Sequence, residues 1–170
     1  MIEYLNENEI YRVGMSMEQA GLDFYMKMAD KADDPATRRV FKQLARDEKE
    51  HLAFFESLET GTSRSMGSGP AERDADVSRY VSSLVKGGIF ANIERMGKLA
   101  RGRFNAEKAL ELALQMEKDA VLYYMEAHGA TRKRSTKQAL ARLADEEKRH
   151  VVQITNRLAR MRKKARTAGK

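Results

Sequence analysis

A duplicated segment is the strongest constraint on what this chain can fold into. The stretch 45–51 (ARDEKEH) returns as 144–150 (ADEEKRH), so Glu48 and His51 recur 99 residues later as Glu147 and His150. The same offset of 99 residues carries Glu18 to Glu117, with no insertion or deletion between residues 17 and 51. The chain therefore contains an internal duplication, and its matched polar residues are of types that bind metal ions.

Helix-favouring residues dominate the sequence, which has only two prolines. Apolar residues recur at spacings of three and four in four long segments, which predicts four helices. We expect the first after Asn6 or Asn8, the second over about 36–59, the third from Asn105 to Gly129 and the fourth over about 135–162. The segment 60–104 is not repeated. It contains a flexible linker at 60–71 and two short helical segments near 77–85 and 89–99.

This pattern predicts an all-α four-helix bundle over residues 1–162, with 60–104 as a crossover, followed by a basic tail at 163–170. The crossover is long enough to run from one end of a bundle to the other.

The four predicted helices carry polar residues where a core residue is expected. In the second helix one inward stripe comprises Phe41, Leu44, Glu48, His51, Phe55 and Leu58, at spacings of 3, 4, 3, 4 and 3. The fourth helix repeats this pattern around Glu147 and His150. Glu18 and Glu117 likewise interrupt apolar stripes of the first and third helices. A single Glu-x-x-His usually lies on a solvated face, but two matched copies are poorly explained by chance.

The spacing of these residues indicates a shared site. Residues three apart on a helix lie on one face, about 4.5 Å apart along the axis, so each Glu-x-x-His pair can direct one oxygen and one nitrogen ligand to the same region. Four buried carboxylates would repel one another, whereas two divalent cations would neutralise them. The predicted metal ligands are Glu18, Glu48, His51, Glu117, Glu147 and His150. Such carboxylate and imidazole ligands suit iron, manganese or zinc, and this arrangement occurs in di-iron and di-manganese carboxylate bundles.

Three further residues lie near the predicted ligands or at a helix end. Tyr25 and Tyr124 follow Glu18 and Glu117 by seven residues, two helical turns along the same face. They are either buried core tyrosines or groups that bond ligands or pass electrons. His128 has no counterpart in the other copy, and we interpret it as a helix-end histidine rather than a ligand.

Composition excludes several functions. With no cysteine there is no disulfide, thiolate metal site or cysteine nucleophile, which fits the reducing cytoplasm where we expect the protein. Residues 1–7 lack an apolar signal core, and no apolar run approaches a membrane span. The net charge of +7 is concentrated at 132–134 and from Arg157 onward. No nucleic-acid reading motif accompanies it, so nucleic-acid binding is a minor alternative to a solvated surface.

These motifs resemble the di-iron domain of the rubrerythrin branch of the ferritin-like superfamily. The resemblance covers about 10–160, and the segment 109–120 (ALELALQMEKDA) is similar to the third helix of short rubrerythrin-like proteins. It implies a ferritin-like four-helix bundle with one long crossover. It also implies that Glu48 and Glu147 bridge two metals, that Glu18 and Glu117 are terminal ligands, and that His51 and His150 each complete one metal.

The sequence departs from that family in two places. Full-length rubrerythrins carry a rubredoxin module with four cysteines, and this sequence has none. Rubrerythrins also tend to place an extra glutamate one turn before the third-helix ligand, where this chain has Leu114. The resemblance therefore implies a minimal ligand set supplied with electrons from outside.

The expected function is a di-iron oxidoreductase that reduces hydrogen peroxide or O2 with electrons from an external donor, such as a rubredoxin-type protein. Its catalytic groups would be the four glutamates, and a homodimer is expected from the resemblance. The alternatives are a ferroxidase or iron-handling protein, a di-iron hydroxylase of an organic substrate, and a helical interaction module whose metals are structural.

Overall fold

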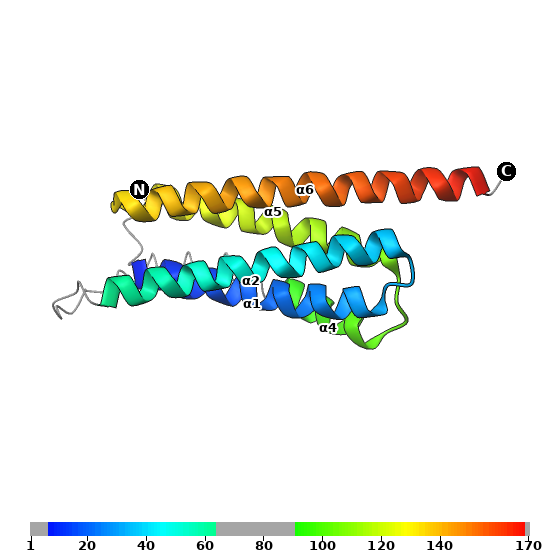
Figure 1. Ribbon diagram of the computed structural model, residues 1–170, viewed down its shortest axis with the longest axis horizontal. Coiled ribbons are helices and arrows are strands. Elements are labelled where there is room, and N and C mark those ends of the chain that lie inside the picture. The colour runs from blue at the N-terminus through cyan, green and yellow to red at the C-terminus, as the bar shows by residue number, and fades with distance from the viewer. Residues whose placement is uncertain (1–6, 64–90, 169–170) are drawn as a thin grey trace.

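The structure is a computed structural model that describes residues 7–63 and 91–168. These residues form five helices and no strand, which confirms the predicted all-α fold (Figure 1). The helices are α1 (Glu7–Lys31), α2 (Pro35–Ser63), α4 (Ala91–Arg101), α5 (Ala106–Ala130) and α6 (Arg134–Ala168). The predicted short helix near 77–85 lies outside the described residues.

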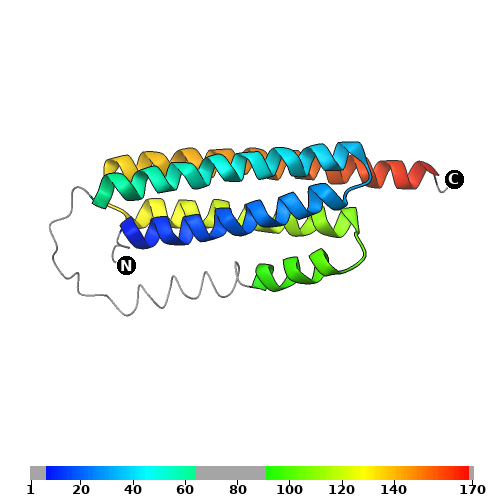
Figure 2. The same ribbon diagram turned by 60° about the horizontal axis from the view of Figure 1, so that its bottom comes forward.

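Four long helices form the bundle as two antiparallel hairpins, α1–α2 and α5–α6, which lie against each other along their length (Figures 1 and 2). The end of α2 and the start of α5 lie at opposite ends of the bundle, as expected for two hairpins joined by a long crossover. The fifth helix, α4, lies outside the four and packs against α1 and α5, on the face away from α2 and α6 (Figure 2).

Side-chain caps fix two of the helix starts. Asp34 precedes Pro35, the first residue of α2, and its Oδ2 accepts hydrogen bonds from the backbone N–H and the hydroxyl of Thr37, both at 2.7 Å. Arg157 of α6 donates to both Asp34 and Thr37, which ties the start of α2 to the opposite hairpin. At α5 the predicted cap is confirmed, since the Asn105 side chain accepts from the backbone N–H of Lys108 at 2.9 Å.

Three predicted boundaries are wrong. Helix α2 continues to Ser63, so residues 60–63 are helical and not linker. Helix α6 continues through 163–168, past the predicted end at 162, and projects beyond the other helices (Figure 2). Helix α5 passes through Gly129, which has no positive φ, and ends at Ala130. Its cap is Thr131, which has an extended backbone and whose N–H bonds to the carbonyl of Ala127 at 3.1 Å.

The core consists of two apolar clusters on either side of a polar layer. One cluster contains Phe24, Phe41, Leu44, Leu110 and Ile154, and the other contains Ile10, Phe55, Tyr124, Leu140 and Leu143. In each helix the residues of the two clusters lie before and after the polar positions singled out above. The polar layer is therefore enclosed by apolar packing at both ends, which lowers its dielectric and strengthens electrostatic interactions within it.

No helix in the described parts of the chain combines the length and the apolar character needed to cross a bilayer.

Candidate metal centre

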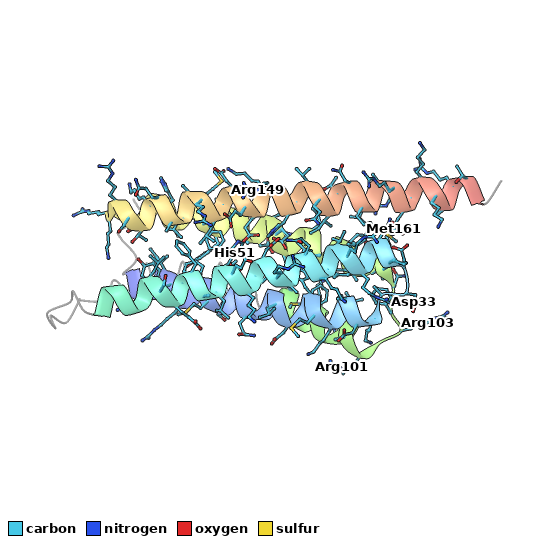
Figure 3. The ribbon with its side chains drawn as sticks, in the orientation of Figure 1. Asp33, His51, Arg101, Arg103, Arg149 and Met161 are labelled. Carbon is cyan, nitrogen blue, oxygen red and sulfur yellow. The ribbon has the colours of Figure 1, made fainter. Side chains whose placement is uncertain are left out.

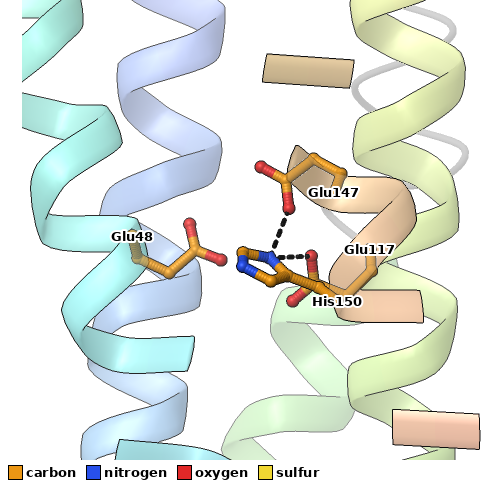
Figure 4. A group of neighbouring side chains, drawn as sticks. All are labelled: Glu48, Glu117, Glu147 and His150. Carbon is orange, nitrogen blue, oxygen red and sulfur yellow. Dashed lines mark hydrogen bonds and ion pairs between the residues drawn. The ribbon is translucent and has the colours of Figure 1, made fainter. Parts of the chain in front are cut away.

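The six predicted ligands meet at the middle of the bundle. Each of the four long helices contributes to them, and every one of the six is buried, with at most 6% of its surface exposed. Their ligand atoms fall into two groups in which all atoms lie within 4.8 Å of one another. The first group comprises Glu48, Glu117, Glu147 and His150 (Figure 4), and the second comprises Glu18, Glu48 and His51. Glu48 belongs to both groups, as a bridging carboxylate would.

A close approach of α1 to α2 makes room for Glu48. A Cβ atom added at Gly21 would lie 3.0 Å from Cδ of Glu48 and 3.2 Å from one of its carboxylate oxygens. Any larger residue at position 21 would therefore displace the carboxylate that both groups share. The sequence placed Gly21 on the apolar stripe of the first helix, but this contact is visible only in the fold.

The two histidines present the same ring atom to the carboxylates. His150 Nδ1 lies 2.8 Å from Glu147 Oε2 and 3.2 Å from Glu117 Oε2 (Figure 4). His51 Nδ1 lies 3.2 Å from Glu18 Oε2 and 3.1 Å from Glu147 Oε1. Both Nδ1 atoms therefore face the centre of the cluster, where a metal ion would be bound.

A second pair of carboxylates holds the outer nitrogen of each ring. His51 Nε2 lies 2.8 Å from Glu146 Oε2, and His150 Nε2 lies 3.2 Å from Asp47 Oδ2. An ionised carboxylate can only accept, so each Nε2 carries a proton. Nδ1 faces the inner carboxylates, and it is the nitrogen that would exchange its proton for a metal ion. The contact between His51 and Glu146 joins α2 to α6. Arg149, three residues after Glu146 on α6, is exposed at the surface of the bundle (Figure 3).

Asp47 and Glu146 were not among the predicted site residues. They are related by the same 99-residue offset and precede the Glu-x-x-His glutamate in each copy. This repeated acidic residue was the available signal. The sequence could not show that each one reaches the histidine of the other copy, because that depends on how the hairpins face each other.

Each of the two equivalent tyrosines hydrogen-bonds a glutamate of the other copy. The Tyr25 hydroxyl donates to Glu117 Oε1 at 2.5 Å, and the Tyr124 hydroxyl donates to Glu18 Oε1. Both tyrosines are almost fully buried. Of the two alternatives left open by the sequence, the structure shows hydrogen bonding to the predicted terminal ligands. Each bond fixes one carboxylate oxygen and leaves the other to face the cluster.

Burial and mutual repulsion perturb the acid groups. Burial, together with neighbouring carboxylates, holds the pKa values of Glu18 and Glu48 well above their usual range and raises the pKa of Glu117 to about 8. For Glu147 burial acts in the same direction, but the contacts with His150 and His51 outweigh it and lower the pKa.

The histidines respond in the opposite sense. Burial disfavours the charged imidazolium, but contacts with Glu147 raise the pKa of His51 to about 9, and contacts with Glu117 and Glu147 raise the pKa of His150 to about 11. The cluster thus attracts positive charge strongly, and in the absence of metal that charge is carried by protons.

The donor set fits a metal. Glu147 Oε1 is buried and has no hydrogen-bond partner, since its 3.1 Å contact with His51 Nδ1 lacks hydrogen-bond geometry. A buried carboxylate oxygen without a partner is costly unless a cation satisfies it. Four carboxylates with two imidazoles and no thiolate suit iron, manganese or zinc. The residues present could therefore hold a metal ion.

Two other expectations concern residues beside the site. His128 is half-buried near the end of α5 and belongs to neither ligand group, as expected. Leu114, which stands where rubrerythrins tend to have a further glutamate, is partly buried and packs against the core cluster that contains Phe41. It adds no ligand atom to the centre.

Two antiparallel hairpins with a buried carboxylate and histidine cluster between them define the class of this protein, a ferritin-like bundle with a candidate metal centre. Among protein-family models, the one described as Rubrerythrin matches residues 1–59, which contain Glu18, Glu48 and His51. Searches of curated proteins and of solved structures each gave no match. Over residues 1–59 the chain is thus similar to the rubrerythrin family, and the internal duplication repeats the matched pattern at Glu117, Glu147 and His150.

Proposed function

We propose that this chain is a di-iron oxidoreductase that reduces hydrogen peroxide or O2 with electrons from an external donor. The observation that carries the proposal is the convergence of four buried carboxylates with two Nδ1 atoms whose opposite nitrogens are held by carboxylates. The family match supports iron as the metal, because rubrerythrins typically bind iron. The lack of cysteine in the 170 residues means that the sequence contains no rubredoxin-type iron site of its own.

The resemblance implies that Glu48 and Glu147 would each bind both ions, and that each of the other four ligands would bind one. Glu48 belongs to both ligand groups, which supports this role for it, and Glu147 lies close to both histidines although it belongs to one group only. Two bound iron ions would supply the electrons for H2O2 + 2 e⁻ + 2 H⁺ → 2 H2O. The side chains of the protein would bind the ions and orient the groups that hold them. Asp47 and Glu146 fix the histidine rings, and Tyr25 and Tyr124 fix the outer oxygens of the terminal glutamates.

Protons and water are also controlled by this arrangement. Burial and mutual repulsion raise the pKa values of the carboxyl groups in the metal-free cluster, so these groups hold protons that would be released when cations bind. The apolar clusters at both ends of the polar layer exclude bulk water. Proton delivery can therefore be limited to groups within the site.

Stopped-flow kinetics test the proposal. Protein purified without added metal should contain iron, and after anaerobic reduction it should be reoxidised faster by peroxide than by air. Glu117→Gln should impair both iron content and reoxidation. Glu126→Gln, which changes an exposed glutamate of the same helix, is the matched control.

Two results would redirect the assignment. Peroxide that reacts no faster than air would contradict the peroxidase function. Uptake of iron well beyond two atoms per chain, with mineral formation, would favour the ferroxidase or iron-handling alternative. The rubredoxin-type donor and the homodimer stay predictions, and sedimentation analysis of the purified protein tests the homodimer.

A further inference from the structure

A small cavity lies against the carboxylates between α1, α4 and α5. Its volume is about 40 Å³, and Glu18, Glu48 and Glu117 form one side of it. Neither histidine lines it. The cavity is thus an approach to the candidate metals from the α1–α5 side, whereas the imidazoles come from α2 and α6.

The rest of the cavity wall is largely apolar. Met17 and Met116, which are equivalent in the two copies, line it together with Ala20, Ala120 and Met96 of α4. Such a wall disfavours charged molecules but accepts small neutral ones. A volume of about 40 Å³ exceeds the roughly 10–15 Å³ that one water requires on the same measure, so there is space for a molecule of very few heavy atoms.

Helix α4 forms the outer wall, and a buried polar contact anchors it. Asn92 is 5% exposed, and its side-chain amide donates to Asp119 Oδ2 at 2.8 Å. Gln115 donates to the other oxygen of Asp119, also at 2.8 Å, which fixes the carboxylate in place. Four residues along α4, Met96 is 8% exposed and faces the same cavity.

The anchor exists in only one of the two halves. The residue equivalent to Asp119 in the first copy is Ala20, which has no hydrogen-bonding side chain, and α4 belongs to the segment that is not duplicated. The ligand set is nearly symmetric between the copies, whereas this contact breaks the symmetry and places α4 over the cavity.

We propose that this cavity binds the oxidant, and that Asn92 and Met96 make α4 a size filter which admits O2 or hydrogen peroxide and excludes organic hydroperoxides. This assignment rests on the proposed function for the chemistry that follows binding. The occupancy of the cavity by a small neutral molecule can be tested without any metal or turnover.

The first experiment measures O2 in the cavity. Metal-free protein labelled with [¹³C-methyl]methionine is examined by NMR with and without dissolved O2, whose paramagnetism speeds relaxation of nearby methyl groups. The methyls of Met17, Met96 and Met116 should relax faster with O2 than that of Met28, which is fully buried but does not line the cavity. Equal effects at all four would overturn the assignment.

The second experiment tests the filter. Reduced, iron-loaded protein should react with hydrogen peroxide much faster than with cumene hydroperoxide. Met96→Ala should raise the ratio of the cumene hydroperoxide rate to the hydrogen peroxide rate by about tenfold, because several side-chain atoms are removed from the wall and the bulky peroxide gains more from this than the small one. Met125→Ala, which truncates an exposed methionine on α5, is the control and should change neither rate.

These results separate the inference from the proposed function. Equal rates with the two peroxides in the unmodified protein, or a Met96→Ala variant that behaves like Met125→Ala, would overturn the size filter. A protein that reacts with neither peroxide, but shows strong O2 relaxation at the three methyls, would contradict the peroxidase function and support the cavity assignment.

Discussion

Glu146 offers the sharpest test of how the metal ligands are held. Its Oε2 atom accepts from His51 Nε2 at 2.8 Å, and its Oε1 atom accepts from Arg142 Nε at 2.9 Å. Burial works against its ionisation, but the bonds from Arg142 and His51 outweigh this and lower its pKa, so Glu146 is charged at neutral pH. Glu146→Ala would leave Nε2 of a nearly buried imidazole without its acceptor.

The expected loss follows from this geometry. A hydrogen bond to a charged group contributes about 1.5–3 kcal/mol, and each 1.4 kcal/mol is a factor of ten in affinity. The Glu146 side chain is 21% exposed, so solvent screens its hydrogen bond to His51, and we use the lower end of this energy range. We expect Glu146→Ala to weaken metal binding roughly tenfold. Glu146→Gln keeps an acceptor oxygen but loses the charge, and its loss should be smaller, about threefold.

Anaerobic Fe(II) titration against a coloured chelator measures this affinity directly. Asp145→Asn is the control, because Asp145 is the adjacent acid on α6, is 66% exposed and pairs only with Lys148 among the interactions described for it. Asp47→Ala should match Glu146→Ala, since Asp47 holds the other histidine in the equivalent way. If Glu146→Ala bound Fe(II) as tightly as Asp145→Asn, the role assigned to the outer carboxylates would be wrong.

Three further predictions concern the site and its frame. Gly21→Ala should displace Glu48 and weaken metal binding, whereas Gly129→Ala, whose Cβ meets nothing within 4 Å, should raise the unfolding free energy by about 0.5–1 kcal/mol in urea denaturation. If Gly21→Ala weakened metal binding no more than Gly129→Ala does, the close approach at Gly21 would be contradicted. Tyr25→Phe should leave metal content nearly unchanged but slow peroxide reduction, because the α5 carboxylate loses its orienting donor; unchanged kinetics in stopped flow would refute that role. Asp34→Ala should cost about 1 kcal/mol of stability at pH 7. Hydrogen bonds from Thr37 lower the pKa of Asp34, so its contribution is present above the unfolded pKa of about 3.9 and is lost as pH falls through the folded value. Urea curves for both proteins should therefore converge in acid, and a gap that persists there would count against the cap.

Much of the fold could be read from the sequence, because helices depend on local periodicity. The spacing of apolar residues around Glu48 placed α2, and Asn105 marked the start of α5. The sequence predicts the ends of the helices less accurately than their positions. The glycine at position 129 predicts the end of α5, but the helix continues one residue further and is capped by Thr131. A glycine permits a helix to end without requiring it, and neighbouring contacts decide where it ends.

By itself, the sequence determined which side chains would enter the core, since a carboxylate on an apolar stripe must turn inward when the stripe does. The 99-residue duplication then determined that these groups would come in matched sets. Only the tertiary structure decided their partners. His51 is held by Glu146, Tyr25 reaches Glu117, and α4 is anchored at Asp119. These pairs are 95, 92 and 27 residues apart, and such contacts depend on which helix faces which, a property that no local pattern in the chain encodes.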